Sequence, residues 1–266
     1  ITRKRGESVQ YFTQVGTGNY NEVTSEQYTD LSVITSDERV GRDAAQTFEA
    51  LATGQTPPET EALWVAPLSY RSRVRELSEA ETAKGEAGRI ASTVNSMNDI
   101  GGKTALIRAS RAGVRTELFI RGICCLLPGV PGKTENITVS SIVGRFLEHS
   151  RIYVFGRGEN EKMYISSADM MTRNTERRVE IACPIDSPEV RARLHDILFA
   201  MLHDTVKARV LQPDGSYSRK PSVPEPLCAQ DLLMQQAVSM ASEQAMHAAA
   251  PERGLLPWLR RLFGRN

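Results

Sequence analysis

The run from Ser141 to Asn174 constrains the fold of this chain more than any other segment. It contains two apolar, strand-like stretches, RIYVF and MYIS, joined by a short polar turn. His149 and Arg151 lie at the start of the first stretch. The end of the second stretch carries further polar residues: Ser166, Ser167, Asp169, Arg173 and Asn174. Arginine presents a fixed fork of donors to phosphate oxygens, and histidine exchanges protons or attacks phosphorus near neutral pH. The segment therefore predicts a site for a phosphate or a phosphoanhydride.

Strand-like and helix-like patterns alternate along most of the chain. The expected strands are 8–15, 63–66, 89–94, 116–120, 137–143, 151–155, 163–166, 178–183 and 206–211. The expected helices are 40–51, 71–84, 102–112, 188–201 and 228–250. This alternation is typical of an α/β domain, with a mixed sheet flanked by helices.

The first expected helix has a start signal, a stop signal and an apolar face. Ser36 is the expected cap, and Gly54 ends the helix. Four apolar residues share the face: Val40, Ala44, Phe48 and Leu51. We expect this face to be buried. The helix at 71–84 is so charged that it is expected to lie on the surface.

Two linkers divide the chain into three parts. GQTPPE at 54–59 and the proline-rich stretch 221–226 contain helix and strand breakers. The expected parts are 1–57, the end of a first domain; 58–220, a nearly complete second domain; and 221–266, a helix with a basic and apolar tail. The tail, at 254–266, is either packed or irregular, or rests on an anionic membrane.

The composition excludes a global electrostatic attraction to nucleic acid. The 266 residues carry 33 basic and 32 acidic side chains, so an anion site must be local. No transmembrane run or signal peptide is present, and the four cysteines lack metal-ligand spacing. We expect reduced, packed thiols in a cytoplasmic protein. Because Ile1 leads directly into a strand-like pattern, we expect the chain to be a fragment.

Several motifs, occurring in order between about residues 9 and 219, resemble bacterial polyphosphate kinase. They are GTGNYN, YTDLSVIT, TELFIRGICCLLPGVPG, SSIVGRFLEHSRIYVF, YISSADMMTRN and DTVKARVLQPDG. Together they are specific, whereas each alone would be weak. The resemblance covers the C-terminal portion of the family enzyme, and implies two phospholipase-D-like α/β domains, the first of them incomplete.

The resemblance implies transfer of the terminal phosphate of ATP, reversibly and with Mg²⁺, to inorganic polyphosphate. A histidine phosphorylated in the family, and the magnesium-associated arginines, would lie in a segment before Ile1, so no metal ligand is expected in this chain. The implied partners are ATP or ADP, polyphosphate, the preceding domains and a second subunit in a homodimer. Contact with a membrane surface is a further possibility, and nucleic acid is not expected.

Six residues match family positions in the substrate tunnel. Tyr28, Arg121 and His149 match ATP contacts, and His149 would also act in catalysis. Asp30, Arg173 and Arg178 match further polar residues of the tunnel. His149 considered without the resemblance is more often a structural histidine, and Arg121 alone could simply form an ion pair.

Two positions depart from the family pattern. Gln14 stands where a histidine usually precedes GTGN, and Thr93 stands where a lysine usually precedes the NS turn. Each replacement removes a potential cation. Because glutamine retains hydrogen bonding, we expect Gln14 to keep an orienting role.

Two alternative functions remain open from the sequence. A phospholipase-D-type phosphodiesterase requires a HxK pair, which is weakened here because Arg151 follows His149. A non-catalytic module that binds polyphosphate or nucleotide would need no phosphorylated histidine. We expect the isolated fragment to be inactive.

Overall fold

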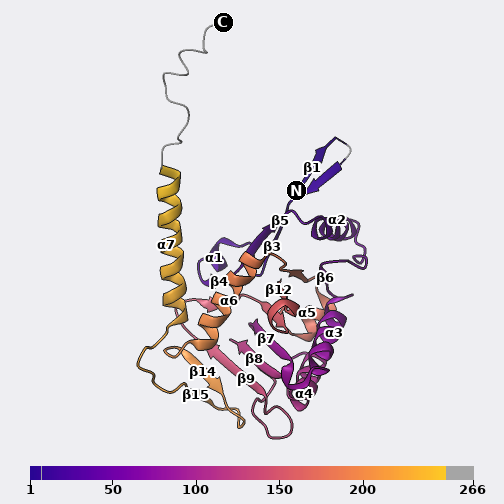
Figure 1. Cartoon of the computed structure of the whole chain (residues 1–266). Coiled ribbons are helices and arrows are strands. Elements are labelled where there is room, and N and C mark those ends of the chain that lie inside the picture. The colour runs from indigo at the N-terminus through magenta and orange to yellow at the C-terminus, as the bar shows by residue number, and fades with distance from the viewer. Residues whose placement is uncertain (7, 250–266) are drawn as a thin grey trace.

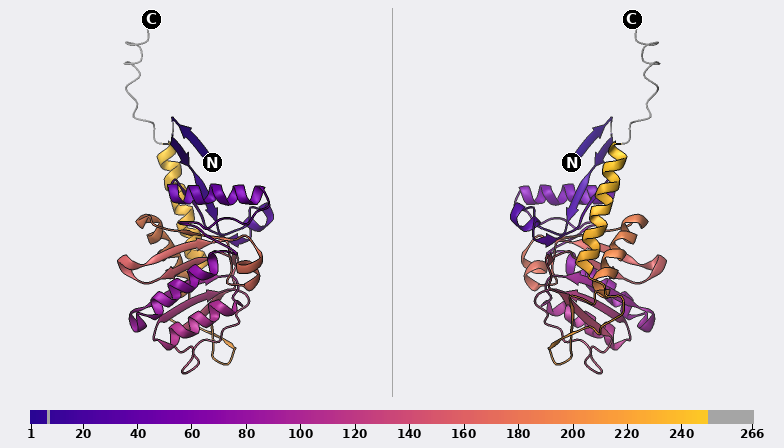
Figure 2. Two further views of the ribbon diagram at one scale, coloured as in Figure 1. Left: turned by 90° about the vertical axis from the view of Figure 1, so that its right-hand side faces the viewer. Right: turned by 90° about the vertical axis from the view of Figure 1, so that its left-hand side faces the viewer.

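The computed structural model describes residues 1–6 and 8–249 (Figure 1). The predicted tail at 254–266 lies outside this range. The described chain forms a nine-stranded mixed sheet with helices on both faces, which confirms the predicted α/β fold class. Its C-terminal helix α7 (Ala229–Ala249) and an N-terminal hairpin project from the same side of the body (Figures 1 and 2).

The order of the sheet is β15-β14-β9-β8-β7-β11-β12-β13-β6. In that order the strands are Tyr217–Arg219, Ala208–Leu211, Ile137–Ile142, Arg115–Ile120, Arg89–Val94, Ile152–Phe155, Lys162–Ser166, Ile181–Pro184 and Trp64–Val65. Strands β7, β8 and β9 are parallel, and the other neighbours are antiparallel. Two helices, α4 (Ile100–Arg111) and α5 (Thr172–Arg177), follow strands at one edge of this sheet.

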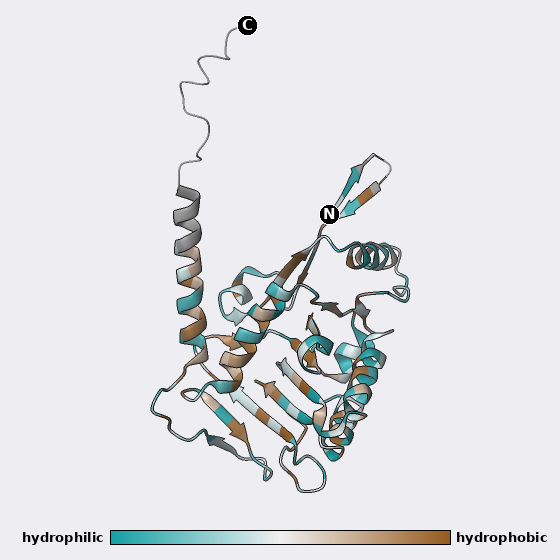
Figure 3. Cartoon of the chain, in the orientation of Figure 1, coloured by the Kyte–Doolittle hydropathy of each residue, from teal (hydrophilic) through white to brown (hydrophobic). Residues whose placement is uncertain are grey.

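The central strands, such as β9 and β11, are buried on both faces, so their sequences are rich in apolar residues. Tyr153 and Phe155 of β11 pack with α3 (Tyr70–Thr82) and α4 on one face. Ile152 and Val154 face the opposite layer, which includes α6 (Pro188–His203). Figure 3 shows the hydrophobic residues concentrated in the sheet strands. The predicted helix at 71–84 is therefore only partly a surface helix, since α3 inserts apolar side chains into the core.

The first 57 residues form small elements above the sheet. A hairpin pairs β1 (Thr2–Arg5) with β2 (Ser8–Tyr11), and β3 (Thr13–Gly16) pairs with β5 (Ser32–Thr35). The short helix α1 (Glu22–Ser25) and strand β4 (Tyr28–Thr29) lie between them in sequence. Strand β4 pairs in parallel with β10 (Leu147–Glu148), just before His149. This pairing carries the N-terminal segment to the predicted site.

The helix α2 (Glu38–Ala52) differs from the expectation in its cap and its buried face. Asp37, rather than Ser36, accepts a hydrogen bond from the first turn. Phe48 is 72% exposed and Leu51 is 42% exposed, whereas Asp43 and Thr47 are buried. The predicted apolar face is therefore wrong in its second half, because a polar contact rather than apolar packing fixes the orientation of this helix.

That polar contact is made by the Asp43 carboxylate. It accepts hydrogen bonds from the backbone N–H groups of Glu61, Ala62 and Leu63, at 2.7 to 3.1 Å. These donors belong to the segment just after the first predicted linker. Asp43 therefore ties α2 to the start of the second predicted domain.

Replacing Asp43 by alanine is expected to lower the free energy of unfolding by about 2–3 kcal/mol, because three amide donors lose a charged acceptor. Urea unfolding of the chain measures the change. Glu49→Ala, an exposed carboxylate on the same helix, is the control and should change stability by less than about 0.5 kcal/mol. Equal effects of the two substitutions would contradict this role of Asp43.

The cysteines are free thiols, as expected, but they are not all packed. Cys183 is buried and Cys125 is exposed, while Cys124 and Cys228 are intermediate. Burial raises the pKa of the Cys183 thiol to about 12, so this thiol stays protonated. The expectation of uniformly packed cysteines is wrong for Cys125, which follows an isolated bridge rather than lying within a strand.

Candidate functional site

Polar residues that the sequence singled out lie together at one end of the central strands, and we call this end the site edge of the sheet. The parallel strands β7 and β8 end there, so Asn95 and Arg121 follow them at this edge. Strand β11 runs antiparallel to β7, which brings His149 and Arg151 to the same edge. Strand β12 returns antiparallel to β11, so Asp169 follows it there. The predicted convergence of these side chains results from the strand directions.

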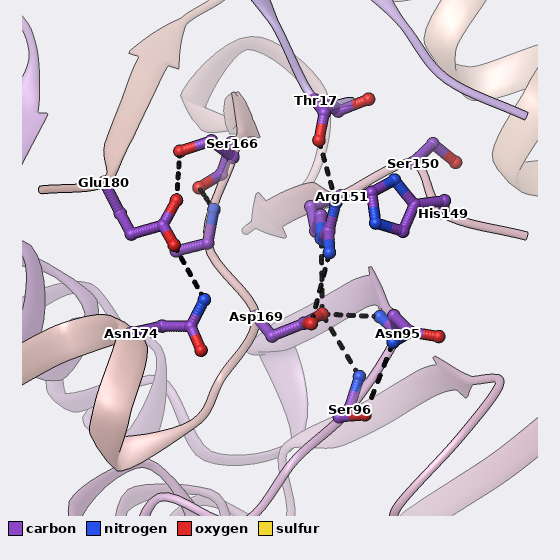
Figure 4. Close-up of polar contacts among 12 residues, drawn as sticks. Thr17, Asn95, Ser96, His149, Ser150, Arg151, Ser166, Asp169, Asn174 and Glu180 are labelled. Atoms are coloured by element: carbon purple, nitrogen blue, oxygen red, sulfur yellow. Dashed lines mark hydrogen bonds and ion pairs between the residues drawn. The ribbon is translucent and has the colours of Figure 1, made fainter. Parts of the chain in front are cut away.

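The centre of this site is a buried ion pair between Arg151 and Asp169 (Figure 4). Arg151 Nε donates to Asp169 Oδ1 at 3.2 Å, and Nη2 donates to Oδ2 at 3.1 Å. The backbone N–H groups of Asn95 and Ser96 also donate to Oδ1. Both charged residues are 5% exposed. The two-point contact fixes the plane of the guanidinium.

His149 contacts both a cation and an anion through one ring atom. Its Nδ1 lies 3.0 Å from Arg151 Nη1 and 3.0 Å from Asp30 Oδ1. Arg151 Nη1 also donates to the carbonyl of Thr17 at 2.7 Å, and the Thr17 hydroxyl donates to Asp30 Oδ1. We call Tyr28, Asp30, His149, Arg151 and Asp169 the His149 cluster.

Tyr28 completes the His149 cluster from β4. Its ring centroid lies 4.6 Å from that of His149, with the planes tilted by 46°. Thr29, the next residue, donates to the buried Glu148 carboxylate. The pairing of β4 with β10 sets both contacts. The structure thus brings together three of the six predicted site residues: Tyr28, Asp30 and His149.

Asp30 approaches the backbone of Gly18 very closely. A side chain at Gly18 would place its Cβ 2.1 Å from Asp30 Oδ2. Only glycine leaves room for the carboxylate at this position. The GTGN turn therefore has a specific task beyond turning the chain, which is to accommodate the acid that contacts His149.

Arg121 follows β8 at the same sheet edge but does not touch the His149 cluster in the described structure. Its backbone N–H is 3.4 Å from the Val94 carbonyl, beside Asn95. Its side-chain Nε is buried and has no hydrogen-bond partner among the described residues. A buried, unpaired guanidinium donor is costly without an acceptor. This geometry favours an anionic ligand or ordered water at Arg121.

Arg173 and Arg178 are exposed, and neither contacts His149. Arg173 lies on α5 and Arg178 directly follows that helix. The nearest acid to Arg178 is Glu180, at 4.0 Å from Nη1. Glu180 is buried and accepts hydrogen bonds from Ser167 and Asn174, a group separate from His149 in Figure 4. The structure therefore does not bring Arg173 or Arg178 into the His149 cluster.

Two buried tyrosines support the strands behind the site. Tyr153 donates its hydroxyl to the carbonyl of Ala168, next to Asp169, and Tyr70 shares a hydrogen bond of 2.8 Å with Ser166. Burial raises the pKa of both tyrosines, so both remain neutral hydroxyls. They fix the backbone on which Asp169 stands.

The two positions that depart from the family pattern have different surroundings. Gln14 is exposed on β3, and its amide donates to the Ser32 hydroxyl. Thr93 is buried in β7 and contacts the carbonyl of Ser150, beside Arg151. Gln14 therefore orients a neighbour in this structure, and Thr93 supports the strand next to the His149 cluster.

His195 on α6 contacts a buried acid. Its Nε2 lies 2.7 Å from Glu161 Oε1, and Arg191 pairs with the same oxygen. The helical spacing of 191 and 195 places both side chains on one face. Glu161 is distant in sequence, so this contact could not be foreseen from the helix alone.

Arg151 and Asp169 belong to the segment that predicts a phosphate site but were assigned no individual role, and Thr17 and Asn95 were not predicted as site residues. Arg151 and Asp169 stood in the motifs, but their spacing did not reveal that they pair with each other. Asn95 acts through its backbone N–H and Thr17 through its carbonyl, which carry no signal in residue identity, and the Thr17 hydroxyl adds a hydrogen bond to Asp30. Among the described residues, no group of three or more histidine, cysteine, aspartate or glutamate side chains is placed to hold a metal ion.

Comparison with protein families gives two adjacent matches. Residues 1–57 match polyphosphate kinase C-terminal domain 1, and residues 63–230 match polyphosphate kinase C-terminal domain 2. The His149 cluster takes Tyr28 and Asp30 from the first matched region and the other three residues from the second.

Individual relatives agree with these matches. The chain is 43% identical over 243 residues to a polyphosphate kinase of Rhodopirellula baltica, covering 90% of this chain and 28% of that protein. It is 41% identical over 248 residues to a polyphosphate kinase of Synechocystis, covering 91% and 34%. The chain thus spans about a third of the length of these relatives.

A solved structure shares the fold. The crystal structure of polyphosphate kinase from Porphyromonas gingivalis superimposes with a TM-score of 0.83 at 34% identity, covering 91% of this chain and 38% of that one. Two matching domain families, similar relatives and a common fold agree with the residue pattern of the site. The chain belongs to the polyphosphate kinase family, in which it corresponds to the C-terminal portion.

Proposed function

We propose that this chain forms the ATP-facing part of a polyphosphate kinase active site. The whole protein would transfer the terminal phosphate of ATP reversibly to polyphosphate, through a phosphohistidine supplied by a segment outside this chain. The observation that carries the proposal is the His149 cluster, which joins an imidazole to fixed charges at one sheet edge. Arg121 adds an unpaired buried donor at the same edge.

His149 is the proposed catalytic residue of this chain. Its Nδ1 is occupied by Asp30 and Arg151, while no hydrogen bond occupies Nε2 among the described residues. Nε2 is therefore the atom available to a phosphoryl or leaving oxygen. A positioned imidazole that donates to such an oxygen accelerates phosphoryl transfer by stabilising developing negative charge.

Tyr28 and Arg121 are the other proposed ATP contacts. Tyr28 is half-buried beside the His149 ring, so its face or hydroxyl is available to the nucleotide. Arg121 would direct its guanidinium to phosphate oxygens. Asp30, Arg173 and Arg178 are proposed to line the phosphate path, with the two exposed arginines meeting the polyphosphate chain rather than ATP.

Mg²⁺ is the cofactor expected from the family, but the described residues do not form a site for it. They contain no set of three potential acidic, histidine or cysteine ligands, and Asp30 is already engaged by Thr17 and His149. We assign no step to a metal through this chain. Any magnesium would be held by the phosphates and by residues outside the chain.

The proposed partners are ATP or ADP, polyphosphate, the remaining domains of the same enzyme and a second subunit of a homodimer. No nucleic acid is proposed, and the location is cytoplasmic. Membrane contact was suggested by the tail at 254–266, which lies outside the described residues. Within the described part, no helix has the length and apolar character required to cross a membrane.

The phosphodiesterase alternative is less well supported than the kinase. It needs a cation free to hold substrate beside the histidine, as the HxK pair provides. Here the guanidinium of Arg151 is committed to Asp169 and Thr17. The non-catalytic alternative is separated from the kinase by turnover measurements on the full-length protein.

Substitution of Arg121 tests the ATP contact. In the full-length enzyme, Arg121→Ala is expected to lower kcat/KM for ATP about a hundredfold, because a guanidinium that meets phosphate is lost. Arg115→Ala, at the opposite end of the same strand, is the control, since Arg115 is exposed and its one ion pair within the described residues is with Glu117. If the two variants have equal kcat/KM, the assignment of Arg121 is incorrect.

A further inference from the structure

The contacts of His149 decide which of its two ring nitrogens carries the proton, because a donor and an acceptor compete for Nδ1. Arg151 Nη1 and Asp30 Oδ1 are each 3.0 Å from Nδ1. Arginine is always protonated, so Nη1 can only donate. The Asp30 carboxylate can only accept. In a neutral imidazole, Nδ1 either carries the proton and satisfies Asp30, or carries the lone pair and satisfies Arg151.

The two competitors differ in their freedom to move. Arg151 is 5% exposed, and its guanidinium is fixed by two bonds to Asp169 and one to the Thr17 carbonyl. A proton on Nδ1 would face the N–H of Nη1 across 3.0 Å, and the guanidinium has no room to withdraw. This arrangement sets one donor against another inside the protein, where an unsatisfied donor is costly.

Asp30 can tolerate the loss of the histidine contact. Its side chain is 25% exposed, so water reaches it. Its Oδ1 already accepts a hydrogen bond from the Thr17 hydroxyl at 2.9 Å. A small rotation of this carboxylate away from a lone pair at Nδ1 leaves it both hydrated and hydrogen-bonded. The rigid, buried partner therefore decides the state of the ring.

We infer that Arg151 is a positioning residue that holds neutral His149 with its proton on Nε2, so that the ring presents an N–H donor to a phosphoryl oxygen. This inference rests on the proposed function for the meaning of Nε2, but the position of the proton can be measured without any activity. Arg151 would thus orient the His149 ring in addition to forming the ion pair with Asp169.

The other groups around the ring do not change this conclusion. Tyr28 contacts the face of the imidazole rather than its nitrogens, as the tilted ring contact shows. Glu148 is directed to Thr29 and Gln230. Asp169 approaches His149 only through Arg151, whose bonds it orients. Among the described residues, Arg151 and Asp30 are thus the charged groups that address Nδ1.

Nitrogen NMR of the imidazole tests the inference in the whole 266-residue chain. Long-range proton–nitrogen spectra distinguish a protonated ring nitrogen from one that carries a lone pair. The chain has four histidines, and comparison with His149→Gln identifies the signals of His149. At a pH where the ring is neutral, the wild-type chain should show the proton on Nε2. A proton on Nδ1 would overturn the inference, with no variant required.

Two variants then separate the competitors. Arg151→Lys keeps a positive charge but cannot bind Asp169 at two points and also reach Nδ1, so the proton should move toward Nδ1. Asp30→Ala should leave the proton on Nε2. If Arg151→Lys folds and keeps the wild-type state, or if Asp30→Ala moves the proton to Nδ1, Arg151 is not the residue that sets it. Failure of the kinase proposal would instead appear as absent turnover with the proton still on Nε2.

Discussion

Replacing Asp169 by alanine is expected to lower the free energy of unfolding by about 3–5 kcal/mol, the range for breaking one side of a buried ion pair. The carboxylate accepts two hydrogen bonds from Arg151 and two from the backbone at the end of β7. Its removal leaves a buried guanidinium and two amide donors without their acceptor. Chemical unfolding of the chain, followed by circular dichroism, measures the loss.

Asp186→Ala is the matched control for this prediction. Asp186 also pairs with an arginine, Arg39, but its side chain is 68% exposed. An exposed pair contributes about 0–1 kcal/mol, so this variant should remain close to the wild type. If Asp169→Ala is as stable as Asp186→Ala, the ion pair does not organise the site and the account of the His149 cluster is wrong.

His149→Ala has the largest expected effect on activity. In the full-length enzyme it should reduce kcat for polyphosphate synthesis by about 10²- to 10⁴-fold, as is usual when a positioned acid or donor is lost. Among the described residues, the polar and ring contacts of the imidazole are with Asp30, Arg151 and Tyr28, so we expect the protein to fold without it. Steady-state kinetics with unfolding curves separates the two effects.

His203→Ala controls for the removal of an imidazole. His203 is exposed near the end of α6, where it stacks on Phe199 and bonds to that residue's carbonyl. It lies on a different element from the His149 cluster, so its kcat should stay within about twofold of wild type, which corresponds to roughly 0.4 kcal/mol. A damaging His203→Ala with a harmless His149→Ala would show that the catalytic assignment is misplaced.

The sequence predicted the fold class because the central strands of the sheet, such as β7, β9 and β11, are buried on both faces. The apolar stretches at β7, β8, β11 and β12 could be located to within one residue of their observed bounds. Their order in the sheet could not, since it depends on pairings between distant segments. The short strands β4, β10 and β15 were missed because two or three residues carry no periodic pattern, whereas β6 lies within the expected strand 63–66.

The part of the candidate site that could be predicted consists of residues whose side-chain type itself suggests a chemical role. His149, Tyr28 and Asp30 meet as expected from the motifs, although they come from segments 119 residues apart. The contacts of Arg151 could not be foreseen, because an arginine two residues after a histidine has many possible partners. Its contact with the Thr17 carbonyl depends on how the GTGN turn approaches β11.

The orientation of α2 was also not predictable from the sequence, because it depends on a contact with a distant segment. Apolar spacing favoured a face containing Phe48 and Leu51, but a single carboxylate at Asp43 meets three amides and turns the helix. Charged hydrogen bonds in a buried setting outweigh two partly exposed apolar side chains. Such contacts are visible only when both partners have been placed in space.

The central claim is that this chain supplies the ATP side of a polyphosphate kinase but not the phosphorylated histidine. In the most direct measurement, the full-length protein and the isolated 266-residue chain are each incubated with radiolabelled ATP and Mg²⁺. The products are then separated by gel electrophoresis. The account predicts labelled polyphosphate from the full-length protein, and neither polyphosphate nor stable phosphohistidine from the isolated chain. Polyphosphate or phosphohistidine formed by the isolated chain, or none formed by the full-length protein, would contradict it.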